Sequence, residues 1–100
     1  MTEPTFTPAL DDAEPYDEFA LEEAVKLDPS FAQAWYNLGL GYAQQYSLAP
    51  SLEALETAER LSPNASQIPY ARATVLSRLG RSAEASEAMR RSESLRSQRE

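Results

Sequence analysis

The chain has 100 residues, of which 42% are hydrophobic and 25% charged, and its formal net charge is −7. This length predicts one small domain, and the acidity argues against non-specific DNA binding, which depends on neutralising phosphates. Cysteine and histidine are absent, which excludes disulfides, Cys nucleophiles, His general bases and nearly all zinc sites. No apolar run approaches the ~18 residues of a membrane span, and residues 1–10 lack the pattern of a secretory signal. We therefore expect a cytoplasmic protein without metal, cofactor, membrane or nucleic-acid ligands.

The charges are unevenly distributed along the chain. Residues 1–31 hold nine acids and one lysine, whereas residues 66–100 hold seven arginines and four glutamates. Two interpretations fit this distribution: the charges lie on solvated helix faces, or the two ends of the chain have opposite electrostatic character. The single lysine against eight arginines suits a high-salt cytoplasm or a GC-rich genome.

The first predicted elements are an acidic arm and a helix. Residues 1–14 carry two prolines, four acids and few large apolar side chains, so they are expected to form a flexible arm. A helix is expected to start near Pro15, because proline suits the first helical turn, and to stop at about Leu27, before Asp28-Pro29. This helix and its turn make up residues 15–31.

Residues 32–65 form the most regular part of the sequence. A helix is expected from about residue 31 to residue 45, followed by a turn and a second helix that carries Pro50 in its first turn and ends at about Leu61. Residues 54–63 repeat residues 20–29 in identity or charge at nearly every compared position, at an offset of 34. The first helix of the chain is therefore predicted to be the second half of a repeat whose first half is missing.

Residues 66–97 repeat the unit with more divergence. Pro69 and Arg72 stand where the preceding unit has Trp35 and Leu38, so the apolar packing is expected to be weakest there.

The ends of the last two helices can also be predicted. The helix that contains Pro69 must begin near Ser66, because proline is tolerated only in the first turn. Gly80 is expected to end that helix, and a polar last helix starts at Ser82, as befits the terminal element of a repeat array.

The spacing of aromatic, small and apolar residues resembles that of the tetratricopeptide repeat (TPR) family, whose period is about 34 residues. The residues that carry the resemblance are Trp35, Leu38, Gly39, Tyr42, Leu55, Ala58 and Pro63, and in the last unit Ala73, Gly80 and Ala85. The resemblance implies an all-α fold over residues 15–97, a TPR-type solenoid of about five antiparallel helices, B1-A2-B2-A3-B3, in a short right-handed superhelix. Such arrays usually need about three repeats, so this chain is marginal, cut from a larger protein or completed by a partner.

The resemblance also implies a peptide-binding surface on the concave face, which the first helix of each repeat lines. The positions are Gln33, Tyr36, Asn37, Leu40 and Gln44, and then Gln67, Tyr70, Ala71, Thr74 and Arg78. Amides can pair with the backbone of an extended peptide, and tyrosine offers a rigid ring with a polar tip. Tyr36 and Tyr70 are expected on a face that the core does not need, so that replacing both by alanine spares the helices. The alternative is that these residues form a solvated concave face that binds no ligand.

Two activities are not expected. Chaperone-binding TPR proteins resemble one another in a clamp of Lys, Asn and Arg for a carboxylate, but here only Asn37 has a counterpart, and Gln67 and Ala71 stand where basic residues belong. Catalysis is not expected, because Glu22 and Glu23 fall on the outer face of a helix and no Ser or Tyr has a base to activate it.

Two functions remain open. The first is a non-catalytic module that binds a protein or peptide. The second is a self-associating scaffold that completes its short solenoid with another copy. The second is suggested by two rows on the outer helices, Glu22, Glu56, Arg90 and Glu23, Thr57, Arg91, and by the Phe19 and Leu21 side of the first helix, which is expected to be open.

Gly39 is expected where the two helices of a repeat approach most closely. A leucine there should overpack the interface. An alanine should be nearly silent, because Ala73 takes the same place in the next unit.

Overall fold

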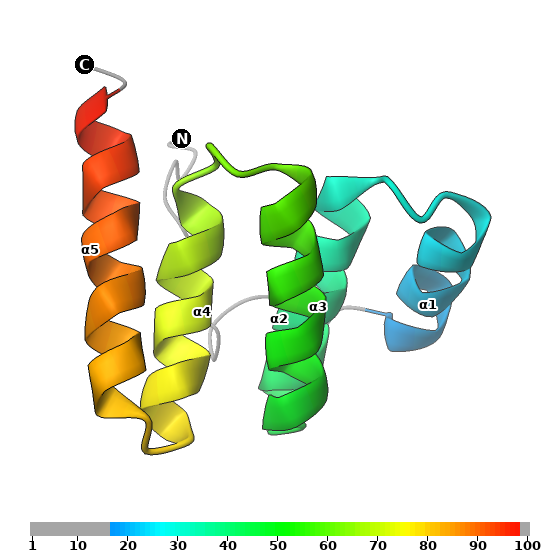
Figure 1. Cartoon of the computed structure of the whole chain (residues 1–100). Coiled ribbons are helices and arrows are strands. Elements are labelled where there is room, and N and C mark those ends of the chain that lie inside the picture. The colour runs from blue at the N-terminus through cyan, green and yellow to red at the C-terminus, as the bar shows by residue number, and fades with distance from the viewer. Residues whose placement is uncertain (1–16, 99–100) are drawn as a thin grey trace, which may run out of the picture.

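The computed structural model describes residues 17–98, and their regular structure is helical throughout. The helices are α1 (Glu18–Leu27), α2 (Ala32–Gln44), α3 (Leu48–Leu61), α4 (Gln67–Arg78) and α5 (Ser82–Gln98). Each packs on the next along the chain, and α2 also contacts α4. Figure 1 shows α5 and α4 at one end, the α2–α3 pair in the middle and α1 at the other end. The described part of the chain is all-α, as predicted; the arm expected over residues 1–14 lies outside it.

Helix α1 begins later than Pro15 predicts. Asp17 has an extended backbone conformation, and its carboxylate accepts a hydrogen bond from the backbone N–H of Ala20 at 3.1 Å. An aspartate in this position satisfies a helix N–H that would otherwise lack a partner. The predicted boundary near Pro15 is therefore wrong, because Asp17 supplies a better N-cap.

The ends of α1 and α3 have the same geometry at an interval of 34 residues. Asp28 follows α1 with φ −140° and ψ 82°, and Ser62 follows α3 with φ −139° and ψ 74°. Their backbone N–H groups donate to the carbonyls of Ala24 and Ala58, both at 2.9 Å. The sequence repeat is thus also a repeat of backbone conformation.

The ends of α2 and α4 repeat in the same way. Tyr46 and Gly80 both adopt positive φ, 60° and 81°. The next N–H group in each case, Ser47 or Arg81, donates to the carbonyl five residues earlier at 2.9 Å, which is the closing bond of a left-handed C-cap. Gly80 therefore caps α4 as predicted, while Tyr46 does so without the freedom that glycine has.

Helices α2 and α3 approach most closely at Gly39. The Ser51 hydroxyl is buried there and donates to the Gly39 carbonyl at 2.7 Å. A Cβ atom added at Gly39 would lie 2.7 Å from both Cγ and Cδ2 of Leu55 and 3.3 Å from the Ser51 carbonyl oxygen. The close approach predicted at Gly39 is confirmed, but a Cβ atom there fits only if Leu55 shifts, which argues against the expectation of a nearly silent Gly39→Ala.

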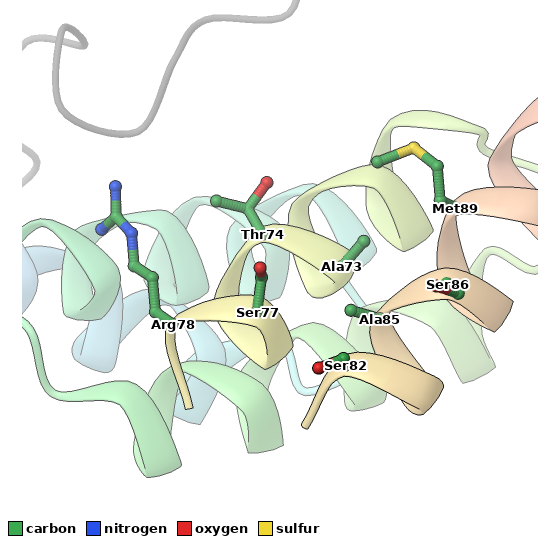
Figure 2. Close-up of a pocket in the computed structure, with 8 residues that line it drawn as sticks. All are labelled: Ala73, Thr74, Ser77, Arg78, Ser82, Ala85, Ser86 and Met89. Carbon is green, nitrogen blue, oxygen red and sulfur yellow. The ribbon is translucent and has the colours of Figure 1, made fainter. Parts of the chain in front are cut away.

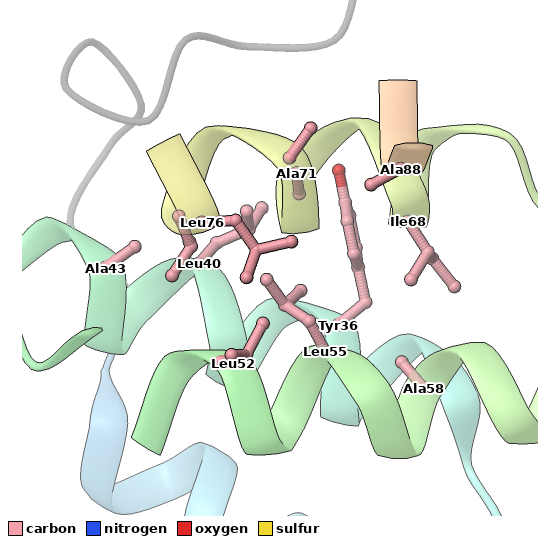
Figure 3. Close-up of a cluster of buried hydrophobic side chains, with 12 residues drawn as sticks. Tyr36, Leu40, Ala43, Leu52, Leu55, Ala58, Ile68, Ala71, Leu76 and Ala88 are labelled. Atoms are coloured by element: carbon pink, nitrogen blue, oxygen red, sulfur yellow. The ribbon is translucent and has the colours of Figure 1, made fainter. Parts of the chain in front are cut away.

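The larger of two apolar clusters joins α2, α3 and α4 and reaches α5. Leu55, Ala58 and Val75 are fully buried in it. Figure 3 shows the side chains of α2 and α3 facing those of α4. The smaller cluster joins α1 to the same α2–α3 pair through Val25, Leu38 and Ala54.

An ion-pair network takes the place of apolar packing where α3 meets α4. Val25 and Leu38 share the smaller cluster, and the residues 34 positions later are Glu59 and Arg72. Arg72 Nε lies 2.7 Å from Glu59 Oε1, with side chains only 21% and 17% exposed. Arg72, which stands where the preceding unit has Leu38, is therefore paired with Glu59. The replacement does not leave a gap in the core.

A second arginine joins this network from α5. Arg91 Nε lies 3.4 Å from Glu59 Oε2, and another Arg91 nitrogen donates to the Pro63 carbonyl at 3.2 Å. Arg91 thus ties α5 to α3 and to the loop that follows it. About half of the Arg91 side chain stays exposed, so Arg91 remains on the outer surface while part of its charge is taken by Glu59.

Replacing Glu59 by glutamine should lower the free energy of unfolding by about 1–3 kcal/mol, because two arginines lose a charged partner in a largely buried place. The urea midpoint should fall with an unchanged slope. The matched control is Glu84→Gln, since Glu84 pairs with Arg81 at 2.7 Å on the exposed surface and such pairs contribute little. Equal midpoints for the two variants would contradict the assigned role of Glu59.

Candidate functional site

Two adjoining pockets open beside the first turns of α2 and α4. The first, called the Phe31 pocket, has a volume of about 310 Å³, and its lining includes Phe31, Gln33, Tyr36, Ala65, Gln67 and Ile68. The second, called the Arg96 pocket, has a volume of about 200 Å³ and is lined by Ser66, Gln67, Tyr70, Ser92 and Arg96. Gln67 lines both pockets, so it forms the wall between them.

The two pockets occupy equivalent places in successive 34-residue units. Each contains a glutamine in the first turn of a helix and a tyrosine three residues later, on the same face of that helix. Four residues of the Phe31 pocket have counterparts 34 positions later in the Arg96 pocket: Ala32 and Ser66, Gln33 and Gln67, Tyr36 and Tyr70, Ser62 and Arg96. The structure therefore brings four of the predicted binding residues, the two glutamines and the two tyrosines, together on one surface.

Tyr36 does not lie outside the core, and that expectation is wrong. Only 7% of the residue is exposed, and Figure 3 shows its ring running from α2 up to α4, beside Ile68 and Ala71. Leu40 and Ala71, also predicted on the binding face, are buried in the same cluster. The reason is that α4 packs directly on α2, so inward-facing positions of α2 become core.

The other predicted residues have different surroundings. Gln33 Nε2 donates to Asn37 Oδ1 at 3.1 Å, which holds two of the amides together on α2. Tyr70 is 37% exposed, while Gln44 is half-buried near the end of α2. Tyr70 is thus the tyrosine of this face that another molecule can reach.

Thr74 and Arg78 line a separate groove between α4 and α5, here called the α4–α5 groove. It has a volume of about 530 Å³, and its lining includes Ala73, Thr74, Ser77, Arg78, Ser86 and Met89. Figure 2 shows hydroxyl groups and Met89 along the groove, with Arg78 at one end. The Arg78 guanidinium lies 5.1 Å from the centre of the Tyr46 ring, a cation–π contact.

The α4–α5 groove is the repeat equivalent of the surface on which α4 packs. That surface includes the buried residues Leu40, Ala43, Leu52 and Leu55, and the residues 34 positions later are Thr74, Ser77, Ser86 and Met89. Three of the four replacements exchange an apolar side chain for a hydroxyl. The groove therefore has the shape of a helix-packing surface with a more polar lining.

Helix α1 carries exposed apolar side chains at the other end of the molecule. Phe19 is 72% exposed and Leu27 is 84% exposed. They are eight residues apart, which places them about 80° apart around the helix axis.

Glu22 is not an outward-facing carboxylate, contrary to expectation. It is half-buried and accepts a hydrogen bond from the Tyr42 hydroxyl at 2.7 Å. This bond, together with burial and the nearby charges of Glu22 and Glu18, raises the pKa of Tyr42 to about 12. The contact fixes α1 to α2 and gives Glu22 a structural role.

The Tyr42–Glu22 contact predicts a loss of stability in strong alkali. The pKa of Tyr42 in the folded chain is above the ordinary tyrosine value of 10.0, so the contribution is fully present below pH 10 and is lost as pH rises toward about 12. Urea unfolding across that range should give a falling free energy. Tyr42→Phe should flatten this dependence, whereas Tyr70→Phe, at an exposed tyrosine, should not; identical pH profiles for both variants would contradict the assignment.

Phe31 and Arg96 are among the pocket residues that were not predicted from the sequence. Phe31 is 49% exposed just before α2, and Arg96 is exposed near the end of α5. The 34-residue comparison was applied only to the first helix of each repeat. Applied also to the loop after α3, it would have identified Arg96 as the counterpart of Ser62.

The described residues contain no group of three or more acidic side chains that could hold a metal ion. None of the described helices combines the length and apolar character needed to cross a bilayer. No protein-family model matches the chain, and no curated protein matches it.

Proposed function

We propose that this chain is a non-catalytic, TPR-type interaction module of the cytoplasm that binds a peptide or protein segment on the face shared by α2 and α4. The observation that carries the proposal is the recurrence of a Gln–Tyr pocket at an interval of 34 residues. A repeated pocket suits a repeated ligand, and an extended peptide repeats its backbone groups at regular spacing. The face described by the Phe31 and Arg96 pockets is called the pocket face below.

The repeated helix ends support the TPR part of the proposal. The helix ends recur at an interval of 34 residues with the same dihedral angles and hydrogen bonds. Stacking of similar units requires such recurrence. The close approach of α2 and α3 at Gly39 and the packing of each helix on the next are expected of a short solenoid. The chain would then hold one half repeat and two full repeats.

The chemistry of the pocket face supports peptide binding. Amide side chains both donate and accept hydrogen bonds, so Gln33 and Gln67 can pair with the C=O and N–H groups of a peptide backbone. Tyr70 adds an accessible ring and a hydroxyl. These groups sit on helices fixed by the core, which limits the entropy lost on binding.

A random peptide library displayed on phage tests this proposal. Peptides selected on the full chain should bind in solution by calorimetry, and Gln67→Ala should weaken them about three- to tenfold, because a net hydrogen bond contributes about 0.5–1.5 kcal/mol. The control is Gln45→Ala, an exposed glutamine just after α2 and outside both pockets. A selection without saturable binders, or binders indifferent to Gln67→Ala, would overturn the proposal.

Self-association is the second candidate, and the α4–α5 groove favours it. The groove has the shape of a surface that carries a helix elsewhere in the chain, and Phe19 and Leu27 of α1 are exposed at the opposite end. A contact between unlike ends is heterologous and can extend from copy to copy. The hydroxyl groups in the groove limit the apolar area, so the association would be weak.

Mixing two variants distinguishes self-association from a protein that stays monomeric. Phe19→Ser removes one end of the contact and Met89→Glu the other, so each variant alone should sediment as a monomer at concentrations where the native chain associates. An equal mixture should form pairs, because each variant keeps one intact end. A native chain that stays monomeric at high concentration would exclude self-association.

A further inference from the structure

We infer that the ligand of the pocket face is an extended peptide with an uncharged apolar side chain and a carboxylate about three residues apart. The apolar side chain enters the Phe31 pocket, and the carboxylate meets Arg96 in the Arg96 pocket. This inference rests on the proposed function and adds the chemistry of the ligand.

The Phe31 pocket selects an uncharged group. None of the residues that line it is charged. Phe31 presents half of its surface at the rim, and Ile68 and Tyr36 close the floor. A charged side chain would lose water there without gaining a partner, whereas an apolar side chain would cover the exposed Phe31 ring.

The Arg96 pocket contains a cation that its repeat equivalent lacks. Arg96 stands where the Phe31 pocket has Ser62, and Tyr70 and Gln67 add further hydrogen-bonding groups beside it. The Ser92 hydroxyl is already used, since it donates to the Ser66 carbonyl at 2.9 Å. The cation and its two polar neighbours form a site for a carboxylate.

Arg96 is the arginine of α5 that the fold leaves available. Arg90 pairs with Glu87 at 3.9 Å, and Arg91 pairs with Glu59 at 3.4 Å. Within the described residues, no carboxylate pairs with Arg96. A carboxylate brought by a ligand would therefore meet a guanidinium that makes no ion pair with the described residues.

The distance between equivalent pockets sets the spacing in the ligand. The pockets belong to α2 and α4, which are in contact, and packed helix axes lie about 8–10 Å apart. A peptide in the extended polyproline II conformation advances about 3.1 Å per residue and has three residues per turn, so side chains three residues apart point in the same direction. The two side chains of the ligand are therefore about three residues apart.

Synthetic peptides with Leu and Glu separated by two serines, in both orders and with blocked ends, provide the test on the full chain. In the better order, changing Glu to Gln in the peptide should weaken binding to the native chain about tenfold, and changing Leu to Ser should weaken it similarly. The Glu-to-Gln change should have no effect on the Arg96→Gln variant, which isolates the contact. Arg90→Gln is the matched control and should bind like the native chain.

The outcomes separate this inference from the proposed function. Library peptides that depend on Gln67 but bind equally with Glu or Gln would overturn the carboxylate assignment and leave peptide binding intact. Binders that lack a large apolar residue near the acid would overturn the Phe31 assignment. No binding of any peptide would overturn both the inference and the proposed function.

Discussion

Replacing Gly39 by leucine should lower the free energy of unfolding by about 1–3 kcal/mol or more, the cost of overpacking a well-packed interface. Even a single Cβ at this position meets Leu55 at 2.7 Å, and Leu55 is fully buried, so it has no free space into which to move. The rest of a leucine side chain would have to displace α3 from α2. A Gly39→Leu variant with the native urea midpoint would contradict the packing described at this position.

Gly39→Ala sets two effects against each other. Alanine gains roughly 1 kcal/mol over glycine in a helix interior, and the clash with Leu55 costs about 1–3 kcal/mol. The expected result is a small net loss, clearly less than for leucine. Ala73 is tolerated at the equivalent place because Met89, an unbranched and flexible residue, stands there in place of Leu55.

Replacing Tyr36 by alanine should cost about 3–5 kcal/mol, the usual range for deleting a buried aromatic ring. In a domain of this size such a loss is a large fraction of the total stability. Tyr36→Phe keeps the ring and should remain folded with a midpoint much closer to that of the native chain. Thermal unfolding followed by circular dichroism distinguishes the two; a Tyr36→Ala variant as stable as Tyr36→Phe would show that the ring is dispensable.

This expectation decides how peptide binding is tested. A chain with alanine at both Tyr36 and Tyr70 would lose affinity through unfolding alone, so it says nothing about the pocket face. Tyr70→Ala is the informative variant, because the residue is partly exposed and its removal leaves the core intact.

The sequence was sufficient to predict the elements that depend on local rules. The positions of Pro29, Pro63 and Gly80 predicted the ends of α1, α3 and α4 to within about a residue. The TPR resemblance implied binding positions at Gln33, Gln67 and Tyr70, and these residues line the two pockets. These features could be found because each depends on backbone conformation or on the spacing of the repeat.

Features that depend on contacts between helices could not be predicted in the same way. Whether Tyr36 faces solvent depends on how closely α4 approaches α2, which no spacing within α2 reveals. The Glu59 network needed three helices to be placed before Arg72 and Arg91 could be paired with it. Glu22 was misassigned for the same reason, since its partner Tyr42 lies on another helix.

The attachment of α1 determines how the molecule opens in its native state. Among the described helices α1 contacts only α2, through the small cluster around Val25 and the Tyr42–Glu22 bond. Detaching α1 would leave the larger cluster of α2 to α5 in place, so this opening needs less free energy than global unfolding. In hydrogen–deuterium exchange, the amides of α1 should therefore lose protection well before those around Leu55, and the end of the molecule that carries Phe19 behaves as a separate cooperative unit.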